Sequence, residues 1–189
     1  MSEVVRGPSV FDHSSDVLTF GLGGLSKAVG LPQLKLGWII VGGPASLVRQ
    51  ALSKIEFICD TYLSVSTPVQ LALESLLEGG MSVADQITQR IRRNYATLRS
   101  LTDEYPASSL LPVDGGWYAP IQVPAIRSEE TLVLELLDRE RVLVHPGYFF
   151  DFSGEAFLVL SLLAESELFE DAVTRMLARV AGGRQMVHR

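Results

Sequence analysis

Apolar runs and helical stripes alternate along the first half of the chain. Two apolar runs, residues 17–21 and 37–43, predict buried strands. Continuous apolar strands are typical of a sheet that is covered on both faces, so they indicate an α/β fold. Apolar residues at helical spacing then predict one helix after Pro44 and a second after Thr67, which ends at Gly79-Gly80.

The longest predicted helix begins at Ser82 and runs to about Tyr105, because its apolar residues stay on one face over that whole length. A helix of this length indicates a connection between two domains. Further elements follow it: strands at 116–123, 141–145 and 156–163, and helices from Ser128 and from Glu165. We therefore expect a compact α+β unit after the long helix, with domains at residues 1–80 and 81–189.

Composition excludes several classes of protein. Of the 189 residues 47% are hydrophobic and 20% charged, which indicates a globular chain. The net charge is −6, and Arg90, Arg92 and Arg93 are the only basic cluster, so nucleic-acid binding is not expected. Apolar runs are shorter than the roughly 20 residues that span a bilayer, and residues 1–15 lack the apolar region of a signal peptide. The single cysteine, Cys59, excludes an internal disulfide, fits a reducing cytoplasm, and is expected to be buried and inert.

Residues 23–38, with the sequence GGLSKAVGLPQLKLGW, hold the candidate chemistry. Lys27 follows an apolar run, and Lys35 lies eight residues later. The glycines permit close approach of a ligand to the backbone, and Pro32 restricts the loop. Taken alone, the pattern fits either an amine presented to a pocket or a surface loop with two solvated lysines. No cluster of His, Cys and carboxylates has metal-ligand spacing, and the isolated Asp114 and Asp151 are expected in turns.

This stretch resembles the cofactor-lysine segment of class I/II (fold type I) aminotransferases, which use pyridoxal 5′-phosphate, and among them the alanine-aminotransferase-like members. The matching residues are Ser26-Lys27, Lys35 and Leu36-Gly37-Trp38. Gly24 stands where the family has a serine that donates to the phosphate. Lys35 stands where the family usually has arginine, which keeps the positive charge but loses the bidentate fork.

The resemblance implies a fold as well as a site. Residues 1–80 would be the C-terminal portion of the large cofactor-binding domain, and residues 81–189 the connecting helix and the small α+β C-terminal domain. Three later landmarks occur in the family's order: Gly115-Gly116-Trp117-Tyr118, Val144-His145-Pro146-Gly147 and Leu160-Ser161.

In the family, Lys27 would be the Schiff-base lysine, whose amine must be uncharged for the chemistry. Lys35 would lie near the cofactor phosphate, and Ser26 would touch the phosphate or hydrogen-bond locally. Tyr118 and Tyr148 are candidates for the substrate pocket, although packing between sheet and helix explains them equally well. His145 is either a pocket residue or a packing residue at a strand end.

Substrate recognition departs from the family at Val159, where an arginine usually binds the substrate α-carboxylate. Three explanations remain open: a substrate without an α-carboxylate, another arginine, or a chain that has lost catalysis. Arg127 is one possible substitute, but a solvated role before a helix is the simpler interpretation.

The implied activity is transfer of an amino group between an amino acid and a 2-oxo acid. Only 26 residues precede Lys27, too few for the family's groups that hold the cofactor ring. We therefore expect an N-terminally truncated chain that lacks stable cofactor binding alone, exposes apolar sheet surface in residues 1–80, and works as a homodimer or with a missing N-terminal half. The alternative is a non-catalytic binding or dimerisation module derived from this fold.

Overall fold

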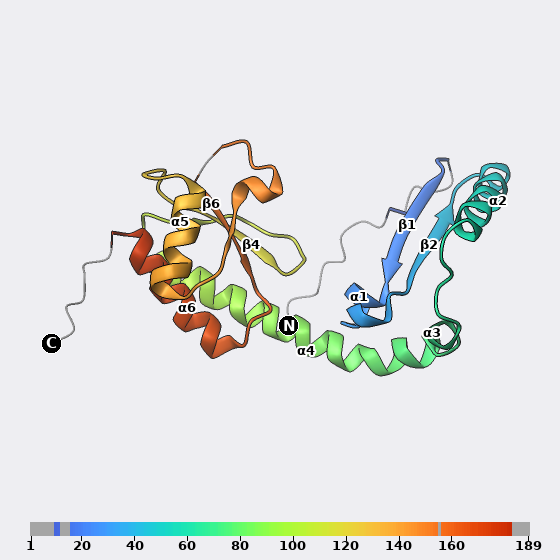
Figure 1. Ribbon diagram of the computed structural model, residues 1–189, viewed down its shortest axis with the longest axis horizontal. Helices are drawn as coiled ribbons and strands as arrows, with labels where there is room; N and C mark the ends of the chain where they lie inside the picture. The colour runs from blue at the N-terminus through green and yellow to red at the C-terminus, as the bar shows by residue number, and fades with distance from the viewer. Residues whose placement is uncertain (1–9, 12–15, 155, 183–189) are drawn as a thin grey trace. The chain divides into compact units, whose positions relative to one another are not determined.

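The computed structural model describes residues 10–11, 16–154 and 156–182. The chain divides into two compact units, Met1–Asp85 and Gln86–Arg189, which are described separately below. Figure 1 labels the elements. In the first unit these are β1 (Thr19–Gly24), α1 (Leu25–Ala28), η1 (Pro32–Leu34), β2 (Gly37–Gly42), α2 (Ala45–Asp60) and α3 (Thr67–Leu71). The helix α4 (Leu73–Glu104) begins in the first unit and ends in the second. The second unit adds β3 (Ser109–Leu110), β4 (Tyr118–Gln122), α5 (Glu129–Glu135), η2 (Leu136–Glu140), β5 (His145–Pro146), η3 (Gly147–Phe150), β6 (Phe157–Ser161) and α6 (Ser166–Val180).

The first unit is built on a two-stranded antiparallel sheet. Strands β1 and β2 pair from Thr19↔Gly42 to Gly24↔Gly37, and their connection carries α1 and η1. A small core of buried leucine and valine side chains anchors this connection: Leu25, Val29 and Leu36. The Leu25 N–H donates to the Leu36 carbonyl at 3.0 Å, which closes the connection at its base.

Both strands form where the apolar runs predict them, but their side chains are not buried in this chain. Leu22 is 80% exposed and Ile40 is 53% exposed. The prediction of covered strands is wrong for the described residues, because two strands and the elements beside them leave apolar surface uncovered. The expected exposure of apolar sheet surface in residues 1–80 is what the structure shows.

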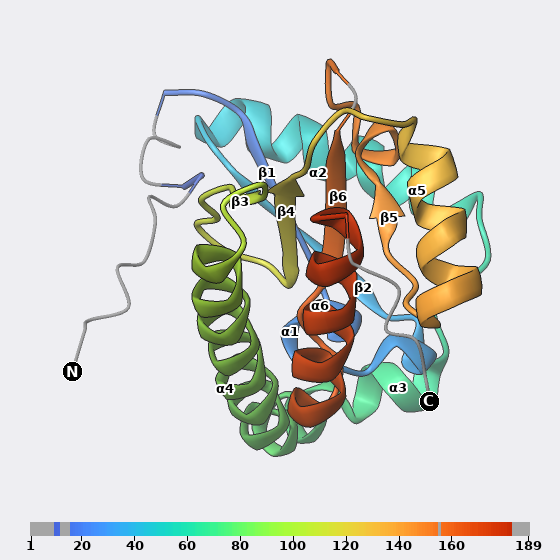
Figure 2. The same cartoon turned by 90° about the vertical axis from the view of Figure 1, so that its left-hand side faces the viewer.

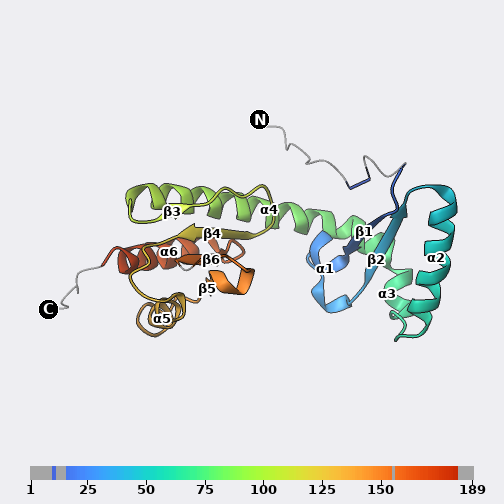
Figure 3. The same ribbon diagram turned by 90° about the horizontal axis from the view of Figure 1, so that it is seen from above.

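The helix α2 follows β2 and runs beside it (Figure 3). Of its side chains only Ala51 is buried, whereas Phe57 is 74% exposed. Cys59 is also exposed, so the prediction of a buried thiol is wrong. The apolar periodicity around Cys59 correctly predicts a helix, but within the described residues no element covers that part of the helix.

Helix α4 continues through Gly79-Gly80, where the sequence predicts an end, and through Ser82, where it predicts a start. The reason is packing. A Cβ atom built on Gly80 would lie 2.4 Å from the Cβ of Val29, so glycine permits the close approach of α4 to the connection that carries Lys27. A Cβ atom at Gly79 would meet nothing within 4 Å. The Ser82 hydroxyl bonds back to the Gly79 carbonyl within the helix.

These two glycines give a matched pair of substitutions. Gly79→Ala is expected to raise the free energy of unfolding by about 0.5–1 kcal/mol, because alanine removes backbone freedom from the unfolded chain without a clash. Gly80→Ala is expected to lower it by about 1–3 kcal/mol, because the new methyl group overpacks against Val29. Urea unfolding followed by circular dichroism measures both. Equal effects at the two positions would contradict the packing account.

The second unit contains a four-stranded antiparallel sheet in the order β3-β4-β6-β5. In Figure 2, α6 lies in front of β6. Alternate strand residues, among them Ala119, Ile121, Leu158 and Leu160, join side chains of α4, α5 and α6 in one core. The helix starts agree with prediction, since the Ser128 hydroxyl accepts from Thr131 N and the Glu165 carboxylate caps α6.

The remaining strand residues point to the other face of this sheet. Pairing across the strands places Tyr118 opposite Ser161, and Pro120 and His145 on either side of Val159. Because directly paired residues project to the same side, these five residues share one face. We call them the second face of the sheet.

Candidate functional site

Lys27 lies in the short helix α1, directly after β1. Its side chain is exposed, and Ser26 before it is half-buried. The helix is held by Leu25 and Val29, which are 0% and 1% exposed on its other side. The backbone turns back after α1 at Gly30, whose φ of 70° is accessible to glycine without strain. The strand, the buried leucine and this turn therefore position the amine of Lys27 at the surface of the first unit.

Lys35 lies on the same connection, just after η1. It ends the η1 turn in the left-handed conformation with φ of 51°, and its side chain is exposed. Elements α1 and η1 pack against one another. Ser26, Lys27 and Lys35 thus lie on one connection between two paired strands.

Gly24 is tightly packed at the point where the family resemblance expects serine. A Cβ atom there would lie 3.1 Å from the Leu36 carbonyl oxygen and 3.3 Å from the Gly37 Cα. Both neighbours are backbone atoms, so a serine at this position would require the two strands to separate by a few tenths of an ångström. Glycine at this position is consistent with a close approach of β1 to β2.

The donor set on this connection suits a phosphorylated aldehyde cofactor. Lys27 supplies a primary amine for the aldehyde, Lys35 a cation for the phosphate, and Ser26 a hydroxyl that can donate to a phosphate oxygen. The lysine at position 35 meets phosphate as a point charge and lacks the planar fork of arginine. These residues fit the aldehyde and phosphate ends of pyridoxal phosphate.

Tyr118 and Tyr148 belong to a cluster of aromatic rings in the second unit. The cluster comprises Tyr118, His145, Tyr148, Phe149 and Phe150, from β4, β5 and η3. Ring centroids of Tyr118 and Phe150 lie 5.5 Å apart, and those of Tyr148 and Phe149 lie 4.9 Å apart. Tyr118 is 40% exposed and Tyr148 is 52% exposed, so both rings combine packing with an accessible surface. The ring contacts show the packing that the sequence offers as one alternative, and a role in substrate binding stays a prediction.

Val159 lies in the middle of β6 and is 3% exposed. All five residues of β6 are uncharged. The strand itself therefore offers no cation to a carboxylate, as the sequence suggested.

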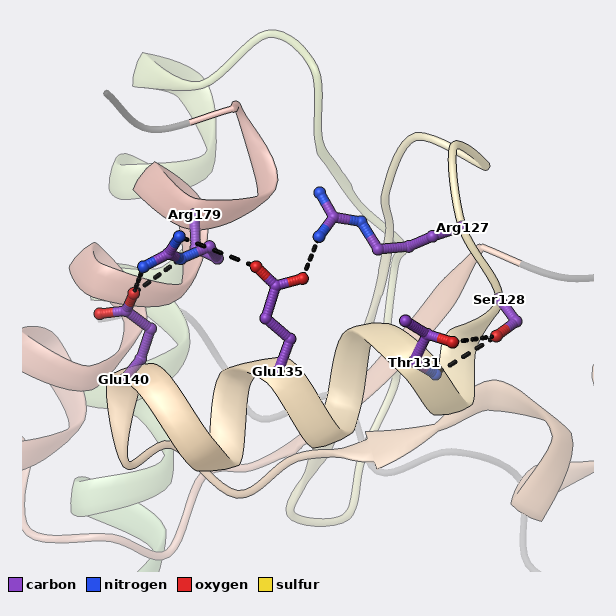
Figure 4. A network of polar contacts seen from close by, with 6 residues as sticks. All are labelled: Arg127, Ser128, Thr131, Glu135, Glu140 and Arg179. Carbon is purple, nitrogen blue, oxygen red and sulfur yellow. Dashed lines mark hydrogen bonds and ion pairs between the residues drawn. The ribbon is translucent and has the colours of Figure 1, made fainter. Parts of the chain in front are cut away.

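Arg127 is committed to an ion-pair network, shown in Figure 4. It pairs with Glu135, whose other oxygen lies 3.7 Å from Arg179, and Arg179 Nε donates to Glu140 at 2.7 Å. The guanidinium of Arg127 thus ties the segment that precedes α5 to the last residue of that helix, Glu135. This arrangement favours a structural role for Arg127 over substitution for a substrate-binding arginine.

Glu129 is a buried carboxylate that the sequence does not single out. It is 3% exposed, its Oε1 accepts from Phe157 N at 2.7 Å, and its Oε2 accepts from Tyr148 N at 3.0 Å. A Cβ atom on Gly147 would lie 3.0 Å from Oε1, so glycine leaves room for the carboxylate. Glu129 therefore fixes the aromatic segment at Tyr148 to the start of β6. In the sequence it resembles any acidic residue in the first turn of a helix.

The described residues hold no group of three or more His, Cys, Asp or Glu side chains placed to bind a metal. Across the same part of the chain, every helix is too short or too polar to cross a membrane.

Comparison with known proteins places these features in a family. The sequence profile of aminotransferase class I and II matches residues 3–176. The glutamate-pyruvate aminotransferase AlaA of Haemophilus influenzae is 27% identical over 177 residues, which cover 90% of this chain and 44% of that protein. The alanine aminotransferase of Mycobacterium tuberculosis is 28% identical over 174 residues, covering 89% of this chain and 41% of that protein.

Solved structures show the same fold. An aminotransferase from Escherichia coli superposes with a TM-score of 0.78 at 21% identity, covering 95% of this chain and 46% of the other. The alanine aminotransferase of Pyrococcus furiosus superposes with a TM-score of 0.72 at 21% identity, covering 92% and 48%.

The chain thus spans less than half the length of these relatives, from the lysine segment to the last helix of the second unit. The profile match covers most of the sequence and includes Lys27, Lys35 and the three later landmarks. Membership implies pyridoxal phosphate as the cofactor. The chain belongs to the class I and II aminotransferase family and is similar to its alanine-aminotransferase members.

Proposed function

We propose that this chain is the lysine-bearing and small-domain part of a pyridoxal-phosphate aminotransferase. The observation that carries the proposal is the single connection that presents Ser26, Lys27 and Lys35 between β1 and β2. The reaction is transfer of an amino group from an amino acid to a 2-oxo acid. Similarity to a relative named as an alanine aminotransferase supports alanine as the donor.

Each residue of the connection has a defined task in this proposal. The bound cofactor withdraws electrons from the substrate α-carbon. Lys27 holds the cofactor aldehyde when substrate is absent and moves the proton at the substrate α-carbon when substrate is present. Lys35 pairs its ammonium with the phosphate, and the Ser26 hydroxyl donates to a phosphate oxygen. Tyr118 and Tyr148 are the residues that we propose for substrate binding in the second unit.

A fusion with a relative tests the function. The segment of the Haemophilus influenzae AlaA that precedes its matched region is joined to this chain, and amino transfer from alanine to 2-oxoglutarate is measured. The proposal predicts transfer that Lys27→Ala abolishes and Lys54→Ala leaves intact, since Lys54 lies on the exposed surface of α2. A fusion that folds and binds the cofactor but transfers nothing would contradict it.

The crowding at Gly24 and the buried Val159 favour a second candidate, a non-catalytic binding or dimerisation module. The fusion separates the two, because a module would fold with the added segment without retaining the cofactor at Lys27.

In either case the first unit is expected to associate with further polypeptide. Phe57 and Leu22 are among its most exposed apolar side chains, and contiguous apolar surface on a soluble protein marks an interaction surface. Within the described residues, β1 and β2 carry no charged side chain that would discourage edge pairing. The proposed partner is a second copy of this chain or polypeptide that corresponds to the part of the relatives that this chain does not cover.

Phe57→Glu is expected to lower the association of the purified chain, because a charge replaces an exposed apolar anchor. Light scattering over a concentration series should show the midpoint of association moving about tenfold higher, as expected when an anchoring side chain is removed. Glu56→Gln, on the neighbouring exposed position, is the control and should shift the midpoint little. The same midpoint for Phe57→Glu and the unaltered chain would contradict this expectation.

A further inference from the structure

The second face of the sheet carries one side chain that can hold a positive charge. Of its five residues, Tyr118, Pro120, Val159 and Ser161 are neutral, and only His145 can be cationic. His145 pairs directly with Val159 across β5 and β6, so its ring stands beside the buried valine. The imidazole is partly exposed, which leaves it accessible from outside the sheet.

Aromatic rings surround the imidazole. Its centroid lies 6.4 Å from the ring of Tyr118 and 6.1 Å from the rings of Phe149 and of Phe150. No residue that the structure describes forms a hydrogen bond or ion pair with its nitrogens. On β6, the hydroxyl oxygen of Ser161 accepts a hydrogen bond from Leu163 N at 3.4 Å. This bond does not use the hydroxyl proton, which can therefore be donated to a ligand. The face therefore combines hydrogen-bond donors with an apolar rim.

Glu129 makes this face rigid. Its two bonds, to the backbone N–H groups of Tyr148 and Phe157, hold the segment that carries Phe149 and Phe150 against β6. A fixed aromatic rim lowers the entropy cost of binding a flat apolar group. The rings also cover part of the imidazole, and a charged hydrogen bond is stronger where it is shielded from bulk water.

We propose that His145 binds the carboxylate of the substrate, and that the surrounding rings contact its apolar part. This rests on the proposed function, since it names the substrate-recognising residue of the same enzyme. The imidazole N–H donates to a carboxylate oxygen, and the hydroxyl of Ser161 is the second donor. Arg127 does not compete for this role because Glu135 occupies its guanidinium.

The test uses two ligands of the same shape and different charge. The intact chain is titrated with 3-phenylpropionate and with 3-phenylpropanamide, and saturation-transfer NMR gives both dissociation constants without added cofactor. We expect the carboxylate to bind about fivefold more tightly than the amide, as a partly exposed charge-assisted hydrogen bond would give. In His145→Phe the ring and its packing remain but the N–H is lost, so we expect a ratio of about one with amide binding unchanged.

His145→Arg is the rescue variant and should restore a preference for the carboxylate. The proposal is overturned if His145→Phe keeps the preference, if the unaltered chain binds both ligands equally, or if it binds neither. Because no cofactor takes part in this titration, a negative result does not bear on the capture of pyridoxal phosphate by Lys27. Conversely, if the chain shows the preference but its fusion with the relative's segment binds the cofactor and transfers nothing, the proposed function alone is refuted.

Discussion

Glu129→Ala is expected to lower the free energy of unfolding of the second unit by about 4 kcal/mol, since two charge-assisted hydrogen bonds are lost and two partly buried N–H groups lose their partner. Glu129 is 3% exposed and accepts from Tyr148 N and Phe157 N. A methyl group in its place leaves a cavity into which water enters only at a cost. This is a large fraction of the 5–15 kcal/mol that stabilises a typical domain.

Glu130→Ala is the matched control, because Glu130 is the next residue in the same helical turn and is exposed. Its effect should stay within about 0.5 kcal/mol. Urea unfolding followed by the fluorescence of Trp117, in a Trp38→Phe background, reports the second unit specifically, since these are the two tryptophans of the chain. Comparable effects of the two alanine substitutions would show that the buried carboxylate does not hold the aromatic segment.

The secondary structure of this chain could be predicted mainly where local chemistry decides it. The strands around Gly21 and Gly37 follow from apolar runs, and the cap at Ser128 follows from a hydroxyl placed before a helical stripe. The break predicted at Gly79-Gly80 is wrong because helix propensity is a weak preference that packing overrides. Contact between α4 and Val29 requires glycine at position 80, and one-dimensional patterns do not show it.

Burial was less predictable than secondary structure. Cys59 and the strand residues have the periodicity of buried positions, yet they are exposed in the described part of this chain. A hydrophobic pattern indicates which face of an element needs cover, and we expect other polypeptide to supply that cover. The relatives are more than twice as long as the matched region, which agrees with this explanation.

The residues of the candidate site also differ in how well the sequence predicts them. Lys27 and Lys35 were recognisable because a short motif fixes both the chemistry and the spacing. Glu129 and the pairing of His145 with Val159 depend on strand register and on contacts between residues far apart in the sequence. Such information enters only with the three-dimensional fold.

The central claim is that Lys27 is the lysine that carries the cofactor. The chain has three lysines, Lys27, Lys35 and Lys54, so each can be compared with the others in one experiment. Ser26 and Lys35 can hold the phosphate while the aldehyde reaches Lys27. Lys54 lies on α2, outside the connection that carries these residues. Borohydride reduction fixes the cofactor to the amine that it has reached, and it does so even when binding is brief.

The purified chain is therefore mixed with pyridoxal phosphate, reduced with borohydride, digested, and analysed by mass spectrometry for label at each lysine. Labelling of Lys27 is expected to exceed that of Lys54 about tenfold, the effect of one charge-assisted phosphate contact. Lys35→Ala should reduce the label at Lys27 by a similar factor, whereas Lys54→Ala should not change it. Equal labelling of the three lysines, or label at Lys27 that does not respond to Lys35→Ala, would contradict the claim.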